Sequence, residues 1–250
     1  MQLILPVFLY LMIGLFAGFM SGMFGIGGGS VRIPLLYVAG LPLLSAFGIN
    51  LLVIPISSFV GAMSHRKNIN WKIVPYILIG GALGSILGAF LAGLISNLML
   101  SILFVMISII TVLGIYFNRI SPGLAQKIKP KTGYFIGGTF FLNLITGMRG
   151  GSGGSLFPPF LRMMKLEIHH AIATSLFVTI FTASAGVIIF WYRGDIVLFP
   201  ALVVIVGSII GARLGSVISL KTKPNWLEIG LSVFVIILAL ITVFKSIFHG

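Results

Sequence analysis

Long apolar runs divide the chain, and most of them have the length needed to cross a bilayer. They fall at about 3–24, 43–64, 73–96, 97–117, 133–148, 168–192, 195–219 and 227–247. A helix needs about 20 apolar residues to span the hydrocarbon of a membrane. The runs are continuous rather than alternating with period two, so they do not fit the strands of a barrel. The pattern therefore predicts an all-α polytopic membrane protein.

The composition supports the same prediction. Hydrophobic residues make up 58% of the 250 residues and charged residues only 8%, whereas a soluble domain carries about 25% charged residues. The chain has no cysteine, which excludes disulfides and thiolate metal sites. The first apolar run has no basic region before it and no convincing cleavage site, so we expect it to be retained as the first span.

Sixteen lysines and arginines stand against three acids, Glu167, Asp195 and Glu228. The basic residues lie mainly in short gaps between apolar runs, as the positive-inside rule predicts. No separate polar domain carries a basic face, so no nucleic-acid partner is expected. No glycine run continues into the Gly-Lys-Ser/Thr of a P-loop, and the histidines and acids do not form a set of hard metal ligands. We therefore expect no cofactor, no metal and the lipid bilayer as the surrounding partner.

Two glycine-rich segments, residues 25–30 and 150–155, are copies of each other. A shift of 125 residues superimposes them and also pairs Gly22 with Gly147, Pro34 with Pro159, Ala46 with Ala171, Gly61 with Gly186 and Pro75 with Pro200. A shift of 123 matches residues 84–89 with 207–212. One unit therefore occurs twice, at 1–118 and 133–250, joined by a basic linker at 119–132. Such duplication is typical of secondary transporters.

The distribution of basic residues indicates how the repeats are oriented. The gap that holds Arg66, Lys67 and Lys72 is basic, and its counterpart near Arg193 is neutral. The positive-inside rule predicts this exchange for inverted repeats. Inversion needs an odd count, so we expect about five crossings per half, including a broken Gly-Pro element, with both termini outside and the linker inside. Eight spans in parallel repeats, with both termini inside, are the alternative.

Broken helices at matching positions of two repeats point to a transport site. A break at membrane depth exposes backbone amides, which are tolerated only where they are buried or line a polar cavity. Such amides, and the positive end of the helix that follows, suit an anion. The residues predicted to bind a small anionic substrate are Gly27, Gly28, Gly29, Ser30, Asn50, Gly153, Gly154, Ser155, Thr174 and Ser175. Arg32 and Arg149 flank the glycine runs and are candidates for attracting the anion.

These candidates also have structural interpretations. Asn50 and Ser175 can form interhelical hydrogen bonds, and the flanking arginines can lie at the membrane interface. Glycines elsewhere in the spans fit close helix packing better than binding; they are Gly80, Gly81, Gly84, Gly88, Gly207, Gly211 and Gly215.

An intramembrane serine protease is a second function class. Residues 150–153 fit a GxSG motif with Ser152 as nucleophile and His169 or His170 as base, and such a base must lie within hydrogen-bond reach. However, the first repeat has Gly27 in place of this serine and no matching histidine. Duplicated geometry without duplicated chemistry is expected of a transporter rather than an enzyme.

The duplicated pattern Gly-Met-x-Gly-x-x-Gly-Gly-Ser with its trailing prolines, and Ala-Ile-Ala-Thr-Ser-Leu at 171–176, resemble the sulfite exporter TauE/SafE family. The resemblance extends from Leu3 to about Phe244. It implies a permease of the prokaryotic inner or plasma membrane for small organosulfur compounds or sulfur oxyanions such as sulfite and sulfonates. The first half departs from the pattern at 48–51, where Gly-Ile-Asn-Leu stands in place of Ala-Thr-Ser-Leu, which puts its share of the binding in doubt.

We therefore expect a secondary transporter that moves a small sulfur-containing anion by alternating access, with an anion channel as the alternative. All three acids lie near the ends of predicted spans, so either His170 carries a coupling proton or the substrate gradient and membrane potential drive the flux. An interior-negative potential favours export of an anion. The sequence leaves open the substrate, the direction and whether the protein forms a homo-oligomer.

Overall fold

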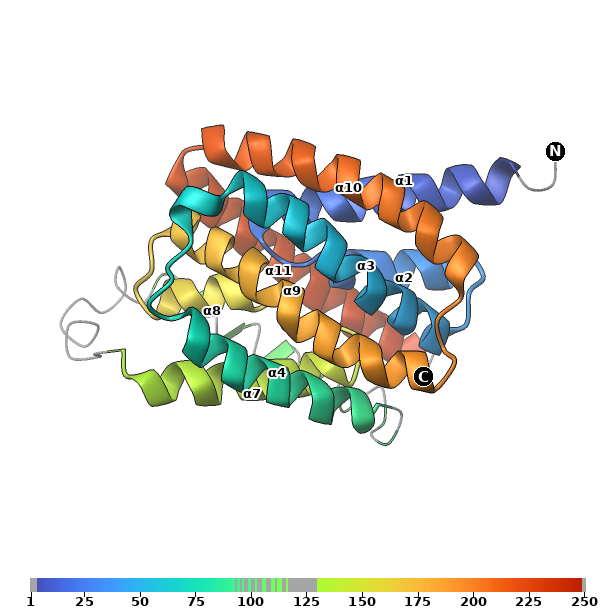
Figure 1. Cartoon of the computed structure of the whole chain (residues 1–250), viewed down its shortest axis with the longest axis horizontal. Coiled ribbons are helices and arrows are strands. Elements are labelled where there is room, and N and C mark those ends of the chain that lie inside the picture. The colour runs from blue at the N-terminus through green and yellow to red at the C-terminus, as the bar shows by residue number, and fades with distance from the viewer. Residues whose placement is uncertain are drawn as a thin grey trace.

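The computed structural model describes residues 4–92 and 130–248 and, between them, positions 94, 96, 99, 102, 105, 106, 109, 110, 112, 113 and 116. The described residues form helices and connecting loops without a strand (Figure 1). The helices are α1 (Ile4–Phe24), α2 (Gly29–Val38), α3 (Leu43–Ser64), α4 (Val74–Phe90), α7 (Thr132–Gly147), α8 (Phe157–Met163), α9 (Ile168–Tyr192), α10 (Leu198–Lys221) and α11 (Pro224–Phe248), with a 3-10 turn, η1 (Arg66–Asn68). Most of the predicted run at 97–117 and of the linker lies outside the described residues.

Four of the described helices, α1, α3, α9 and α10, are long and apolar enough to cross a membrane. Two shorter apolar helices, Val74–Phe90 and Pro224–Ile237, accompany them. Large apolar side chains remain exposed on the outer faces, such as Leu5 at 74% and Leu202 at 60%. Such surfaces are stable only against lipid, because water would penalise each exposed apolar side chain. The prediction of an all-helical integral membrane protein is confirmed.

Helices α1 and α10 pack backbone against backbone along a seam of glycines. A Cβ atom at Gly18 would lie 2.7 Å from the Cα of Ser208, and one at Gly211 would overlap the carbonyl of Leu15. Residues 14–22 face residues 204–216 in the same order, so the two helices run parallel. Small residues permit this close approach, which replaces the hydrophobic effect as the source of helix association in lipid.

A second seam joins α4 and α7 in the same way. Gly80 faces the backbone at Ile136 and Gly88 faces it at Leu144, so these helices are also parallel. The packing interpretation of the glycines in α4 and α10 is thus confirmed. At the centre, α3 and α9 run antiparallel, as Figure 1 shows: Gly61 of α3 faces Leu176, Leu51 faces Gly186, and Gly48 faces Asp195 and Ile196 just after α9.

The two ends of the molecule differ in what they carry. The first turn of α1 and the end of α11 lie at the right-hand end in Figure 1. The α3–α4 and α8–α9 loops lie together at the other end, where the backbone N–H of Asn70 donates to Thr174 Oγ1 at 3.0 Å. The loop end is rich in basic residues, including Arg66, Lys67 and Lys165.

The seam between α1 and α10 predicts that replacing glycine by alanine changes the stability of the protein in opposite directions at Gly211 and at Gly137. Gly137→Ala places its methyl in open space in α7 and should raise the free energy of unfolding by up to about 1 kcal/mol, because alanine orders the helix at lower entropic cost. Gly211→Ala forces α1 and α10 apart and should destabilise by about 1–3 kcal/mol. Thermal unfolding in detergent measures both, and equal shifts for the two variants would contradict the seam.

Candidate functional site

The helix that begins each half breaks at its glycine run. Residues 25–28 separate α1 from α2, and residues 148–156 separate α7 from α8. Five glycines of these breaks have left-handed backbone: Gly25 (φ 72°), Gly27 (73°), Gly28 (73°), Gly150 (66°) and Gly153 (69°). Any other L-residue pays about 1–2 kcal/mol for this conformation, so the density of glycine follows from the path of the chain.

The two breaks touch each other in the interior of the protein. A Cβ atom at Gly154 would lie 2.9 Å from the carbonyl oxygen of Ile26 and 3.2 Å from the nitrogen of Gly27. Ile26 is 2% exposed and Leu156, just beyond the second break, is fully buried. We call this contact between residues 25–28 and 150–154 the glycine crossing. Backbone groups that no longer bond within a helix therefore meet away from lipid, as a membrane interior requires.

Each break receives a hydrogen bond from the central helix of the opposite half. Asn50 Nδ2 of α3 donates to the carbonyl oxygen of Gly150 at 2.7 Å. Ser175 Oγ of α9 donates to the carbonyl oxygen of Gly25 at 2.7 Å. The shift of 125 residues relates both donors and both acceptors, so the two hydrogen bonds are counterparts of each other. We call these two hydrogen bonds the reciprocal braces. Asn50 and Ser175 therefore satisfy buried carbonyls that lost their helical partners.

Arg32 lies at the crossing as a fully buried cation. Its Nη1 donates to Asn50 Oδ1 at 2.6 Å and its Nη2 donates to Ser208 Oγ at 3.2 Å, while Nε has no partner among the described residues. The interface interpretation of this arginine is wrong, because a side chain at the interface would reach water.

Among the described residues, no carboxylate neutralises Arg32. The three acids of the chain have other contacts: Glu167 accepts from backbone at the start of α9, Asp195 pairs with Arg193 at 3.0 Å and Glu228 pairs with Arg162 at 2.6 Å. A buried charge without a counter-ion costs several kcal/mol. The arrangement therefore favours an anionic guest beside the guanidinium.

Neutral polar groups surround the second break, and apart from Ser152, the candidate protease nucleophile, the sequence did not single them out. Thr146 Oγ1 accepts from the backbone N–H of Gly153 at 2.7 Å. Asn143 Oδ1, Ser152 Oγ and Thr179 Oγ1 are buried without a partner among the described residues. The repeat held a weak signal, because Thr146 matches Ser21 under the 125-residue shift. Unpaired buried hydroxyls of this kind can donate to oxygens of a guest.

The other predicted residues are distributed around the crossing. Ser155 is buried and Ser30 partly exposed. Thr174 turns away from the glycines towards the loop end, where it accepts from Asn70. His170 Nδ1 lies 2.7 Å from the carbonyl oxygen of Asn68, also at the loop end. Arg149 lies two residues after the end of α7 and is partly buried.

The protease alternative finds no support at Ser152. Within the described chain its hydroxyl has no hydrogen-bond partner, so neither His169 nor His170 is in position to act as its base. The described residues also hold no group of three or more potential metal ligands.

Comparison with known proteins identifies the family of the chain. The family described as sulfite exporter TauE/SafE matches residues 10–242. The chain belongs to the TauE/SafE family. A "probable membrane transporter protein" of Haemophilus influenzae is 27% identical over 94% of the chain and 97% of its own length. Another of Methanocaldococcus jannaschii, MJ0441, is 29% identical over 92% of each, and YunE of Bacillus subtilis is 25% identical over 94% and 97%.

No solved structure matches the TauE/SafE chain at a significant level. The family and these relatives are described as membrane transporters and not as enzymes. The expected resemblance and the non-enzymatic class are therefore confirmed, and the protease alternative is not favoured.

The reciprocal braces predict a position-specific cost on α9. Ser175→Ala leaves the carbonyl of Gly25 buried without its side-chain donor and should destabilise by about 1–3 kcal/mol. Ser184→Ala is the matched control, because that hydroxyl is exposed and bonds only to Ile180 of its own helix. Thermal unfolding in detergent separates the two. A loss no greater for Ser175→Ala than for Ser184→Ala would contradict the brace.

His65, directly after α3, predicts acid sensitivity. Its ring is 1% exposed and neither nitrogen has a partner within the described residues. Burial, with a smaller contribution from His169, lowers the pKa of His65 to about 4. The unfolded chain takes up this proton near pH 6.5, so stability should fall as pH drops from 6.5 to 4. His65→Phe introduces the residue found at the matching position 190. In this variant the melting temperature should depend less on pH between 6.5 and 4, and an unchanged dependence would refute the assignment.

Proposed function

We propose that the protein is a secondary transporter that moves a small sulfur-containing anion, such as sulfite or an organosulfonate, across the membrane. Membership of the TauE/SafE family supports the class of function. The single observation that carries the proposal is Arg32, a fully buried guanidinium without a carboxylate partner at the meeting point of two helix breaks. Such a group is stabilised when an anion binds beside it.

In this proposal the anion binds between the guanidinium and donors of the two breaks. Amides of Gly27, Gly28 and Gly29 and the hydroxyl of Ser30 act from the first half. Gly153, Gly154 and Ser155 act from the second half. Asn50 and Ser175 position the breaks through the reciprocal braces. Backbone amides in a concave loop suit oxyanions without requiring a second buried charge.

We further propose that the halves, 1–118 and 133–250, are inverted repeats of about five crossings, joined by a linker at 119–132. The antiparallel course of α3 and α9, which match under the 125-residue shift, supports inversion. The shift also exchanges the seam of α1 with α10 for the seam of α4 with α7, which supports a twofold relation between the halves. The basic loop end, with Arg66 and Lys165, would face the cytoplasm by the positive-inside rule. The membrane would then be a prokaryotic inner or plasma membrane.

Inverted repeats supply a physical route to alternating access. Two halves with the same fold and opposite orientation can exchange conformations, which opens the crossing first to one side and then to the other. An interior-negative potential contributes about 2.3 kcal/mol per charge per 100 mV to the exit of an anion, so export needs no coupling ion. A channel is the alternative mechanism, and saturating flux with counterflow distinguishes a carrier from it.

Proteoliposomes loaded in turn with sulfite, thiosulfate, methanesulfonate and sulfate test the function. Arg32→Gln should lower anion flux about 10- to 100-fold, because charge-assisted hydrogen bonds contribute about 1.5–3 kcal/mol. Arg213→Gln is the matched control, since Arg213 is exposed and donates to Ser64 Oγ at 2.8 Å away from the crossing. Flux within twofold of the unmodified protein in Arg32→Gln would rule out the proposed site, and absence of flux for every anion would rule out the function.

A further inference from the structure

A recess of about 570 Å³ opens at the loop end of the molecule, outside the glycine crossing. Asn70, Trp71 and Lys72 line it from the α3–α4 loop, and Lys165, Glu167 and His170 line it from the other half. The recess therefore lies between the two halves at the loop end.

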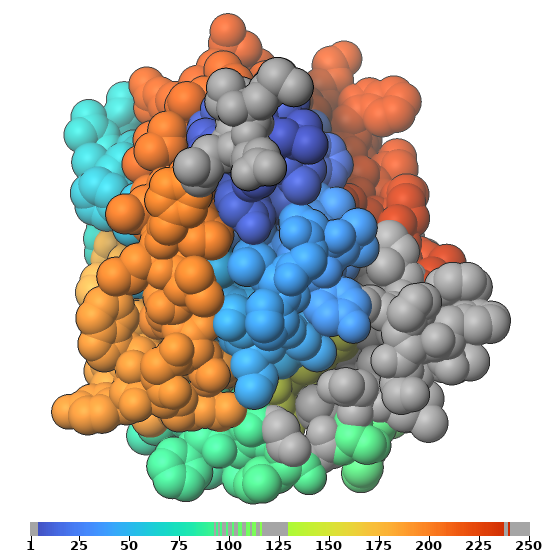
Figure 2. All heavy atoms as spheres, turned by 90° about the vertical axis from the view of Figure 1, so that its right-hand side faces the viewer, coloured from blue at the N-terminus to red at the C-terminus, as the bar shows by residue number. Residues whose placement is uncertain are grey.

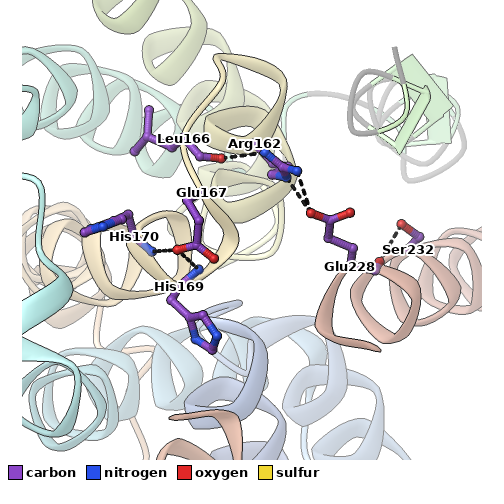
Figure 3. Close-up of polar contacts among 7 residues, drawn as sticks. All are labelled: Arg162, Leu166, Glu167, His169, His170, Glu228 and Ser232. Atoms are coloured by element: carbon purple, nitrogen blue, oxygen red, sulfur yellow. Dashed lines mark hydrogen bonds and ion pairs between the residues drawn. The ribbon is translucent and has the colours of Figure 1, made fainter. Parts of the chain in front are cut away.

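The charges in this recess do not cancel. Neither Lys72 nor Lys165 forms an ion pair with any of the three acids of the chain. The carboxylate of Glu167 accepts from the backbone N–H groups of His169 at 2.9 Å and His170 at 3.3 Å (Figure 3). The carboxylate therefore caps the N-terminus of α9 and stabilises that helix. Two ammonium groups remain for a ligand.

The backbone that carries Lys165 is fixed in place. Lys165 has φ 68°, the only left-handed non-glycine residue in the described chain. Arg162 links this turn to α11, as Figure 3 shows. Its Nη1 donates to the carbonyl oxygen of Leu166 at 3.1 Å, and its Nε donates to Glu228 of α11 at 2.7 Å. The left-handed residue belongs to the C-terminal turn of α8, in which the backbone N–H of Leu166 donates to the carbonyl oxygen of Leu161 at 3.1 Å. The backbone from which the Lys165 side chain extends is therefore well defined.

The recess is close to the crossing but separated from it by hydrogen bonds. Asn70 donates its backbone N–H to Thr174, and the next residue, Ser175, holds the carbonyl of Gly25. His170 Nδ1 carries the proton in its contact with Asn68, because a carbonyl oxygen can only accept. At the opposite end, atoms of the first three helices lie directly against those of α9 and α10 (Figure 2).

We propose that this recess is a separate binding site for a small organic anion, in which Lys72 and Lys165 bind the charged group and Trp71 contacts the apolar part. In this proposal the anion binds first in the recess at the loop end. It then passes to the glycine crossing when the Asn70–Thr174 and Asn68–His170 hydrogen bonds break. The transport role of the site rests on the function proposed above, whereas the anion binding itself does not.

Trp71 provides a direct readout of binding, because its side chain is 59% exposed at the recess. Trp191→Phe and Trp226→Phe leave it as the sole tryptophan. The full chain in phosphatidylcholine nanodiscs, which contain no anionic headgroup, is titrated with methanesulfonate at constant ionic strength. We expect a saturable change in emission. In the Lys72→Gln/Lys165→Gln variant the midpoint should rise at least tenfold, and each single variant should fall between.

Lys221→Gln/Lys223→Gln is the matched control, because these lysines lie at the same end outside the recess lining; its midpoint should not change. A response that does not saturate, or an equal midpoint in both double variants, overturns the site. If anionic nanodisc lipid alone gives the same response and methanesulfonate adds nothing, the recess binds headgroups and the proposal is overturned.

The experiments distinguish failure of the recess site from failure of the proposed transport function. In Arg32→Gln the titration midpoint should stay within twofold of the unmodified protein although flux is lost, which supports two distinct sites. A midpoint that shifts with Arg32→Gln and not with the recess lysines would assign the response to the crossing and overturn the inference. Saturable binding that depends on the recess lysines, without flux in proteoliposomes, would support the site and reject the transport function.

Discussion

A helix that breaks inside a membrane must find hydrogen-bond partners within the protein, and the architecture of this protein follows from where those partners come from. Each break takes a donor from the opposite half, Asn50 for Gly150 and Ser175 for Gly25. Lipid offers no substitute for either donor. Each break therefore depends on a side chain about 100 to 150 residues away in the chain for one of its buried carbonyl groups.

The glycine seams extend this dependence to the outer helices. Helix α1 packs along α10 and α4 packs along α7, so the first helix of one half always lies against the fourth helix of the other. Backbone contact over such lengths makes each pair rigid. The short helices α2 and α8, of 10 and 7 residues, are not part of either seam. The two short helices, each of which follows a break, thus lie outside the close-packed pairs of long helices.

The sequence predicted the long helices better than the side-chain contacts of the candidate site. The runs at 43–64 and 168–192 coincide with α3 and α9, because long apolar segments in lipid have only the helix available to them. The breaks were predictable too, since a dense glycine run followed by proline does not propagate a helix. Side-chain pairing was not, because Asn50 and Gly150 are 100 residues apart and nothing local links them.

Arg32 illustrates the same limit. Its position beside the glycines made it a candidate, but only its neighbours in space reveal that it is buried and lacks a carboxylate. The recess was missed altogether. Its lysines, Lys72 and Lys165, lie 93 residues apart, and the positive-inside rule is a sufficient explanation for each of them taken singly.

The ion pair between Arg162 and Glu228 makes the two halves unequal. The first half has Tyr37 where Arg162 stands, so it cannot form the same bond between its short helix and a carboxylate. In an alternating carrier the two openings then require different free energies, and the protein dwells longer in one orientation than in the other. Influx and efflux would saturate at different concentrations and different maximal rates. Without an external driving force, thermodynamics still requires the ratio of maximal rate to half-saturating concentration to be identical in both directions.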